Sequence, residues 1–354
     1  MTTGNTSFWK KYWKLIVNLV TILALVGFLF AIRGQLVETF EEITHVAWWA
    51  LLLIIPLQVW KYDAQARLYR ALFVIVGNRF SYRQMYETAL ELNFVNTVFP
   101  SGGVSGISYY GVRMRSDNVT GGRATLVQIM KLGLQFLSFE LLLAFGLLAL
   151  AIRGEVNVFL FMLTVILATL LVVGTAFFAY ILASRGRIGA FHTALRGFVN
   201  TTYKVVTGGR GKRRFELARV DDLLLELHKN FQTIKGRWRE LKKPFYLALT
   251  VNVAEILTIY AVYVAFSQWV NIGAVILAYS VANFAGFVSV LPGGVGIYEA
   301  LTVAVLVAGG VPAALGLSVT IMFRVLSTIL QLIPGYYFYH RTIHGEHKMV
   351  SEDA

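Results

Sequence analysis

Several ionisable side chains interrupt segments of this sequence that are otherwise apolar. Arg324 is the twelfth residue of the apolar segment that begins at 313, and Glu255 is the twelfth residue of the one that begins at 244. A charged group at such a depth is costly in a membrane, so it usually marks a transport pathway or an ion pair. The guanidinium of Arg324 suits phosphate, because its planar fork donates two hydrogen bonds at once and keeps its proton. The predicted chemistry is recognition of an anion.

Two interpretations of Arg324 are open. Glu299 directly follows a glycine-rich turn in the same part of the chain, so a Glu299–Arg324 ion pair is the simplest structural role. The alternative is that Arg324 faces a substrate. The two are compatible, because a carboxylate can hold a guanidinium in position for a phosphate.

Four further polar residues in apolar segments are candidate substrate contacts. Lys131 and Glu140 are nine residues apart in one segment, which places them on opposite faces of a helix, so each needs a partner elsewhere. Lys131 also lies near enough to one end to extend toward the membrane surface. Asn252 and Gln331 add polarity to faces of their own segments, and such stripes usually form hydrogen bonds between membrane helices.

Two motifs rich in proline and glycine also interrupt the apolar pattern. LPGGVGI at 291–297 and FPSGGVSGI at 99–107 look like copies, and an Asn-Phe pair precedes each. Proline lacks the backbone donor, and each glycine costs about 1 kcal/mol relative to alanine in a helix. Irregular backbone persists at membrane depth only inside protein or beside a polar cavity, where N–H groups can bind an anion. The predicted substrate-site residues are Pro292, Gly293, Gly294 and Gly296 in one copy and Pro100, Ser101, Gly102 and Gly103 in the other. The alternative is that both motifs are ordinary helix ends.

Composition places these elements in a membrane. The chain of 354 residues is 57% hydrophobic and 14% charged, with no cysteine, which excludes disulfides, thiolate metal sites and cysteine nucleophiles. Apolar runs near the roughly 20 residues that cross the hydrocarbon occur at 15–32, 46–60, 124–152, 155–183, 244–268 and 313–339. We therefore predict an all-α integral membrane protein with about six full transmembrane helices and two broken or re-entrant segments.

The distribution of charge predicts the topology. The residues predicted to be cytoplasmic include the cluster of Lys61, Arg67, Arg70, Arg79 and Arg83, whereas the acidic loop of Glu38, Glu41 and Glu42 is predicted to lie outside. The broken segment at 84–112 then opens to the cytoplasmic side and the one at 274–308 to the outer side. Two units of opposite orientation form an inverted-topology repeat, which is common in secondary transporters.

The predicted organisation has six parts. They are a tail with the first transmembrane helix and an outer loop (1–45), the first repeat (46–152), a connecting helix (153–183), a basic cytoplasmic hairpin (184–243), the second repeat (244–340) and a cytoplasmic tail (341–354). The hairpin holds 15 Lys and Arg against 5 Asp and Glu and carries amphipathic stripes. Such helices pack under a bundle or lie on anionic headgroups, and partner binding is the alternative.

Motifs of soluble catalytic sites are absent from the sequence. The glycine-rich joint of the hairpin departs from a phosphate-binding loop, because Val206 replaces the first glycine and Arg213 replaces the hydroxyl residue. The histidines at 340, 344 and 347 would share one helix face that carries no acidic or thiol residue, which favours a solvated tail over a metal site. We expect no enzymatic activity, no cofactor and no metal.

The motifs PSGGVSG and LPGGVGIYEA and the final segment IMFRVLSTILQLIPGYYF together resemble the lysylphosphatidylglycerol synthase transmembrane-region family. The resemblance covers essentially the whole chain and implies the fold of that family's flippase part. It implies family motif positions for Pro292, Gly293, Gly294, Gly296, Glu299, Arg324 and Pro334, and for Pro100, Gly102, Gly103 and Gly106. The synthases append a cytoplasmic aminoacyltransferase domain, whereas this chain stops soon after its last helix, so we expect a stand-alone translocating part.

Three functions are compatible with these features. The first is a translocase that moves a phospholipid or another phosphate-bearing lipid between leaflets, with Arg324, Glu299 and the glycine motifs at its site. The second is a non-transporting membrane partner that presents lipid to a separate synthase or glycosyltransferase, and the third is a transporter of a small soluble anion. The expected partners are membrane lipids, above all anionic or aminoacylated phospholipids. A separate lipid-modifying enzyme and a second copy of the chain are further possible partners, whereas nucleic acid is not expected. The expected location is a prokaryotic plasma membrane, with both termini cytoplasmic.

Overall fold

The computed structural model describes residues 33–42, 46–99, 104–115, 119–184, 186–190, 237–288 and 296–350, with residues 23, 26–27, 30 and 193. All regular elements in this part of the chain are helical, which confirms the predicted all-α class. The named helices are α2 (Arg33–Glu42), α3 (Trp48–Leu52), α4 (Ile54–Ile75), α5 (Tyr82–Val98), α6 (Val104–Arg115), α7 (Gly121–Ile152), α8 (Val158–Leu182), η1 (Trp238–Leu241), α11 (Lys242–Ala265), α12 (Ile272–Val288), α13 (Ile297–Ala308) and α14 (Ala313–Val350).

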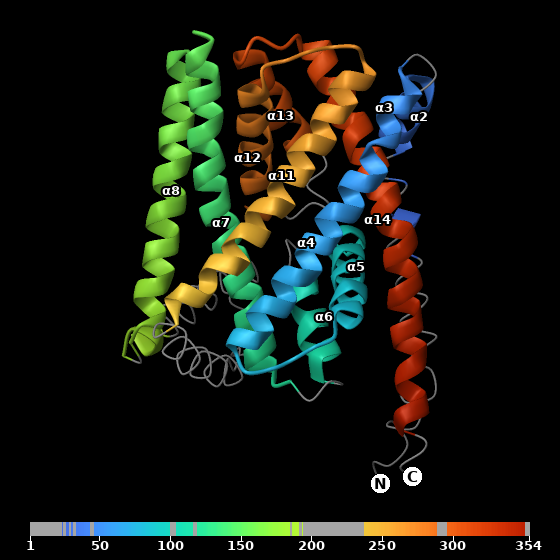
Figure 1. Ribbon diagram of the computed structural model, residues 1–354, viewed down its shortest axis with the longest axis vertical. Coiled ribbons are helices and arrows are strands. Elements are labelled where there is room, and N and C mark those ends of the chain that lie inside the picture. Colours follow the sequence, from blue (N-terminus) through green and yellow to red (C-terminus); the bar gives the residue numbers. More distant parts are fainter. Residues whose placement is uncertain are drawn as a thin grey trace, which may run out of the picture.

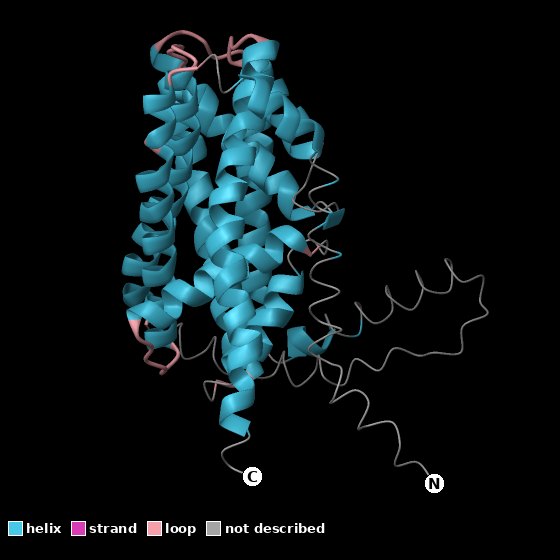
Figure 2. Ribbon diagram, turned by 90° about the vertical axis from the view of Figure 1, so that its right-hand side faces the viewer, coloured by secondary structure: helices cyan, strands magenta, loops and turns pink. Residues whose placement is uncertain are grey.

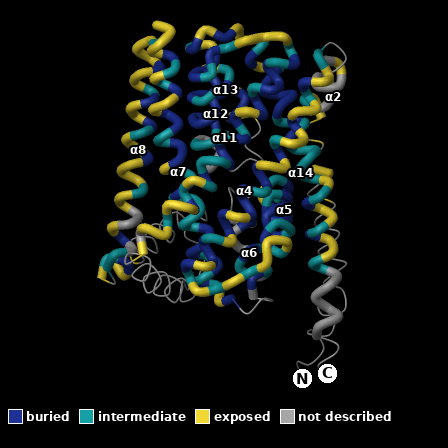
Figure 3. Tube along the Cα trace, in the orientation of Figure 1, coloured by how far each residue is buried: buried dark blue, intermediate teal, exposed yellow. Residues whose placement is uncertain are grey.

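Four described helices are long and apolar enough to cross a membrane. They span Gly121–Ile152, Val158–Phe177, Arg239–Ala265 and Ala313–Ile343. The predicted helix at 15–32 lies largely outside the described residues. The helices run side by side in an elongated bundle (Figure 2), and the outer helix α8 exposes many apolar side chains along its length (Figure 3). An exposed apolar face of this extent suits contact with lipid.

In the N-terminal part, the helix bounds differ from the expected ones in two places. Residues 33–42 form helix α2, although they were predicted as part of an outer loop. The helix predicted from residue 46 is α3 followed by α4, and α4 continues to Ile75. Lys61, predicted to belong to a cytoplasmic cluster, is therefore inside the bundle and only 9% exposed.

The chain contains two units of matching design, α4–α7 and α11–α14. Helices α5 and α12 both have 17 residues, and α6 and α13 both have 12. A single sequence offset maps both ends of α5 onto those of α12, and a slightly larger one maps both ends of α6 onto those of α13. Helices α4 and α11 also end alike, because Gly77 and Ser267 both have a positive φ, 89° and 56°, and begin the same type of turn. These matches support the predicted internal repeat.

The two units are interlocked and point in opposite directions. Helix α4 packs against α11 at the centre, while α5 packs against α14 and α12 packs against α7. Helices α5 and α6 lie at one end of the bundle and α12 and α13 at the other (Figure 1). A helix of 12 residues is about 18 Å long, which is shorter than the roughly 30 Å of bilayer hydrocarbon. We call the end with the turn between α4 and α5 the basic end, because Arg79, Arg83 and Arg123 gather there; the other is the opposite end.

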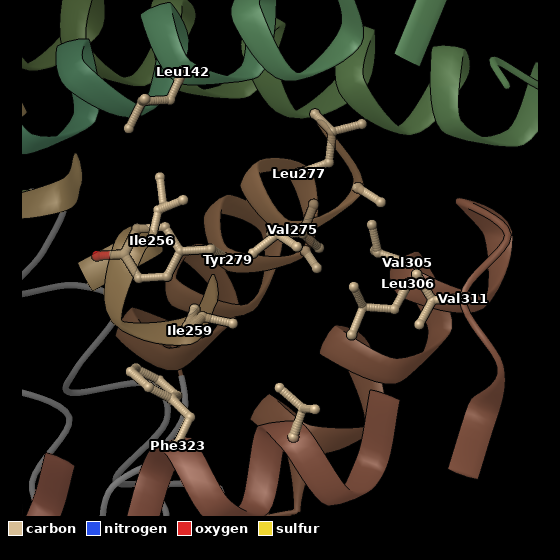
Figure 4. Close-up of a cluster of buried hydrophobic side chains, with 14 of the residues drawn as sticks. Leu142, Ile256, Ile259, Val275, Leu277, Tyr279, Val305, Leu306, Val311 and Phe323 are labelled. Carbon is tan, nitrogen blue, oxygen red and sulfur yellow. The ribbon is translucent and has the colours of Figure 1, made fainter. Parts of the chain in front are cut away.

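The apolar core near the opposite end joins α7, α11, α12, α13 and α14. Leu142, Leu277, Val305 and Phe323 come from four of these helices and belong to one buried cluster (Figure 4). Glycine allows α7 and α12 to approach closely within it. A Cβ added to Gly273 would lie 2.4 Å from the carbonyl oxygen of Gly146, so only hydrogen fits at this crossing.

We expect Gly273→Ala to lower the unfolding temperature, because the added methyl group must separate the backbones of α7 and α12. Overpacking of this kind costs about 1–3 kcal/mol. The measurement is thermal unfolding in detergent micelles, with Gly133→Ala as the matched control, since a Cβ at Gly133 meets nothing within 4 Å. Equal stability of the two variants would contradict the close crossing.

Candidate functional site

The carboxylate of Glu299 is fixed by the way α13 begins. The residue before the helix, Gly296, has a φ of 88°, a value that glycine adopts without strain. Its backbone N–H donates to Oε2 of Glu299 at 2.7 Å. An acidic residue in the first turn of a helix is further stabilised by the helix dipole. The end of the second glycine motif thus holds Glu299 in one orientation.

Glu299 forms an ion pair with Arg324 of α14. The Nη1 of Arg324 contacts Oε1 of Glu299, and the two side chains are only 14% and 8% exposed. The Nε2 of Gln35, in α2, donates to the same oxygen at 2.7 Å. The guanidinium carbon of Arg324 also lies 4.8 Å from the ring centroid of Tyr298. The ion pair offered as the structural role of Arg324 is present.

A second buried ion pair lies deeper in the bundle, between α4 and α11. The Nζ of Lys61 is 2.8 Å from Oε2 of Glu255, and the two side chains are 11% and 14% exposed. The Nε2 of Gln58 donates to the same oxygen at 3.2 Å and lies 3.4 Å from the hydroxyl of Ser327 in α14. Ser327 is one turn after Arg324, so one face of α14 carries Arg324 and reaches the second ion pair through Gln58.

A third polar cluster joins α14 to α5 and α4. The Nε2 of Gln331 donates to the carbonyl oxygen of Asn93 at 2.9 Å and contacts the hydroxyl of Thr97. The side chains of Asn93 and Gln65 exchange two hydrogen bonds, of 2.9 and 3.2 Å. Gln331 therefore forms the interhelical hydrogen bonds predicted for it.

The last cluster lies at the basic end. Glu91, which is 1% exposed, accepts from the hydroxyl of Thr342 at 2.7 Å and from that of Tyr109 at 2.9 Å. The Nε of Arg113 lies 3.2 Å from the same carboxylate. A buried carboxylate with three donors is well satisfied. This cluster ties α5, α6 and α14 together.

These clusters line one face of α14. An α-helix turns about 100° per residue, so four polar side chains of α14 point within about 60° of one another. We call these four residues the polar face of α14: Arg324, Ser327, Gln331 and Thr342. Gly335 lies on the same face, where an added Cβ would be 2.9 Å from the carbonyl oxygen of Leu90. From Arg324 to Thr342 this face is about 27 Å long at about 1.5 Å per residue, close to the thickness of bilayer hydrocarbon. Polar side chains thus occur at both ends of this length, with a gap of about 17 Å between Gln331 and Thr342 in which Gly335 lies.

The other predicted site residues lie apart from this face. The Nδ2 of Asn252 donates to the hydroxyl of Ser138 at 2.9 Å, and Tyr279 donates to its Oδ1 at 3.2 Å, so Asn252 joins α11, α7 and α12. Oε1 of Glu140 is buried and has no hydrogen-bond partner in the described part of the chain. Lys131 lies over the ring of Tyr69. The motif residues Pro100, Ser101, Gly102, Gly103, Pro292, Gly293 and Gly294 lie outside the described residues, so the structure brings together Gly296, Glu299 and Arg324 alone from the motif-based prediction.

Sequence reasoning missed the residues that connect the clusters. Gln58 and Lys61 lie one turn apart in α4, and both contact Glu255. The sequence did contain a signal for Lys61, because an isolated carboxylate such as Glu255 in one apolar helix requires a cation from another helix. Lys61 was instead assigned to a loop with its basic neighbours. Gln35 and Ser327 gave no signal by type or spacing.

We expect the Glu299–Arg324 pair to show strong coupling in a double-mutant cycle of Glu299→Gln and Arg324→Met. Removing one partner leaves a buried charge and costs about 3–5 kcal/mol, whereas the double variant loses less than the sum. The measurement is the free energy of unfolding in mixed micelles. The control cycle is the half-exposed pair Arg237–Glu240, 3.8 Å apart, where coupling below about 0.5 kcal/mol is expected. Additive effects at Glu299 and Arg324 would contradict the ion pair.

Comparison with known proteins agrees with this architecture. The model of the family described as "Lysylphosphatidylglycerol synthase TM region" matches residues 15–335, which include both repeats and most of the polar face of α14. A UPF0104 membrane protein of Methanothermobacter thermautotrophicus is 36% identical over 83 residues, which are 23% of this chain and 25% of that protein. The chain therefore covers a quarter of that relative's length, whereas the family model covers most of this chain. The protein belongs to the lysylphosphatidylglycerol synthase transmembrane-region family.

Proposed function

We propose that this protein moves a phosphate-bearing lipid between the leaflets of the plasma membrane. The observation that carries the proposal is the polar face of α14, whose length is close to the thickness of the hydrocarbon. A headgroup cannot cross hydrocarbon unaided, because each polar group left without a partner there costs several kcal/mol. Hydrogen-bond donors spaced along this face lower that cost while the acyl chains remain in the bilayer. The proposal assigns no bond-breaking chemistry to the chain.

Arg324 is the proposed contact for the phosphate near the opposite end. Its guanidinium has five N–H donors in a fixed fork, and Glu299 accepts from one of its terminal nitrogens. The carboxylate therefore orients Arg324 and neutralises it until an anionic headgroup arrives. Further along the face, Ser327 and Gln331 supply a hydroxyl and an amide that can hydrogen-bond a headgroup in turn.

The two broken segments are proposed to be re-entrant, with α5 and α6 entering from the cytoplasmic side and α12 and α13 from the outer side. Their short helices and their location at opposite ends of the bundle support this arrangement. In transporters built from inverted repeats, access alternates as one unit moves against the other. By analogy, movement of α5 against α14 and of α12 against α7 would open the polar face to each leaflet in turn.

A second candidate function is favoured by a groove at the basic end. The groove has a volume of about 650 Å³ and lies between the last turns of α4 and the start of α11. Arg70 and Lys243 line it beside apolar Val74 and Leu247. Its mixed lining suits an anionic headgroup with its upper acyl chain. A membrane partner that presents such a lipid to a separate enzyme would use this groove rather than the polar face.

We expect reconstituted protein to accelerate loss of fluorescence when dithionite quenches headgroup-labelled lipids in vesicles. The panel contains lysyl-phosphatidylglycerol, phosphatidylglycerol and an isoprenoid phosphate. Arg324→Gln and Gln331→Leu are expected to slow translocation about tenfold or more, because losing a hydrogen bond to a charged group costs about 1.5–3 kcal/mol.

The matched control is Tyr337→Leu, since Tyr337 lies on the same helix but is 60% exposed. It should translocate lipid at the wild-type rate. No acceleration by folded wild-type protein with any lipid would overturn the translocase proposal. In that case Arg70→Gln and Lys243→Gln become the variants to test, by crosslinking to a lipid-modifying partner.

A further inference from the structure

The internal repeat gives Arg324 a counterpart in the first half of the chain. The sequence offset that maps the bounds of α6 onto those of α13 also maps Lys131 onto Arg324. Lys131 is the eleventh residue of α7, counted from the basic end, and Arg324 is the twelfth of α14, counted from the opposite end. At about 1.5 Å per residue, each lies about 15 Å inside its end of the bundle. The two cations occupy equivalent depths from opposite ends.

Lys131 differs from Arg324 in having no internal counter-ion. Its Nζ lies 5.2 Å from the ring centroid of Tyr69, and the side chain is half-buried. Over the described ranges, no carboxylate lies within ion-pair distance of Lys131. Glu140 is further along α7, on the opposite face of that helix. The first repeat therefore presents a cation whose charge the surrounding helices leave unbalanced.

The first repeat has no carboxylate at the position that matches Glu299. The offset that maps α6 onto α13 places Gly106 there, and the offset that maps α5 onto α12 places Tyr109 there. A Cβ added to Gly106 would lie 2.0 Å from Oδ1 of Asn96, an exposed side chain that would have to move to admit a larger residue. The second repeat fills the same position with the counter-ion of Arg324. The two repeats thus provide one neutralised cation and one that awaits an anion.

We propose that Lys131 binds the phosphate of a lipid headgroup in the half of the bundle at the basic end, as the counterpart of Arg324 in the other half. This inference rests on the proposed function, whose pathway it extends to a second site. An ammonium without a counter-ion is costly in apolar surroundings, and a phosphate that enters from the leaflet removes that cost. Contact with the ring of Tyr69 leaves the three N–H donors of Lys131 available to phosphate oxygens.

The difference between the two cations gives them different roles. Lys131 accepts a phosphate without displacing another group, so the first repeat holds the higher-affinity site. A phosphate that binds Arg324 must share the guanidinium with Glu299 or displace that carboxylate. The second repeat therefore holds the site with lower affinity for phosphate and faster release of it.

The test measures binding of phosphatidylglycerol to the full chain in detergent micelles, by native mass spectrometry. We expect Lys131→Gln to weaken binding at least fivefold and Lys131→Arg to retain wild-type affinity, which also shows that the site folds. The matched control is Arg79→Gln, which removes an exposed positive charge at the basic end and should bind as wild type. Competition with inorganic phosphate shows whether the site binds the phosphate of a lipid or a soluble phosphate.

The outcomes separate this site from the proposed function. Wild-type affinity in Lys131→Gln, in a protein that still translocates lipid, overturns the site at Lys131 and leaves the translocase proposal standing. Equal weakening by Lys131→Gln and Arg79→Gln also overturns it, because general loss of charge then explains the effect. Displacement of the lipid by inorganic phosphate at similar concentrations keeps the anion site but assigns it to a soluble phosphate; no displacement assigns it to the lipid. Binding at Lys131 without any translocation by wild type overturns the proposed function alone.

Discussion

A charge buried among apolar helices must have a partner, and this requirement organises the centre of the bundle. Arg324 pairs with Glu299, and Lys61 pairs with Glu255, in each case between two different helices. Since water is scarce at this depth, an unpaired charge would cost several kcal/mol and the pair fixes the helices that carry it. One face of helix α14 carries Arg324 of the first pair and is linked to the second pair through Gln58. Its rotation about its own axis is set by these contacts more narrowly than apolar packing alone could set it.

The internal repeat explains why these contacts run between the two halves of the chain. The 17-residue helix of each repeat packs on the last helix of the other, α5 on α14 and α12 on α7. As a result, Gln331 of the second repeat bonds to Asn93 of the first, and Asn252 bonds to Ser138. The repeats are alike in backbone but not in charge, because the first repeat has no carboxylate where the second has Glu299. The two halves of the bundle therefore have similar backbones but different charges.

The sequence predicts the all-α membrane class and the internal repeat well, because both depend on patterns that extend over many residues. Apolar runs give the membrane helices, and the paired glycine motifs give the two units of opposite orientation. The sequence also offers Glu299 and Arg324 as partners, since both lie in the second repeat near one motif. The positive-inside rule alone misplaces Lys61, because the rule counts charges near helix ends and cannot see that α4 continues past this residue. Gln35 and Ser327 have common polar types, and only the tertiary packing gives them partners.

The interlocked repeats also have a consequence for biogenesis. Thr97 and Gln331 are 234 residues apart, and α5 cannot find its partner on α14 until the ribosome has made the last helix. At about 5–20 residues per second, the polar groups of α5 wait about 10–50 s after they emerge. During that time Asn93 keeps its two hydrogen bonds to Gln65, and the hydroxyl of Thr97 donates to the carbonyl oxygen of Asn93. Gln331 is the partner that arrives last, so the packing of α5 is complete only at the end of synthesis.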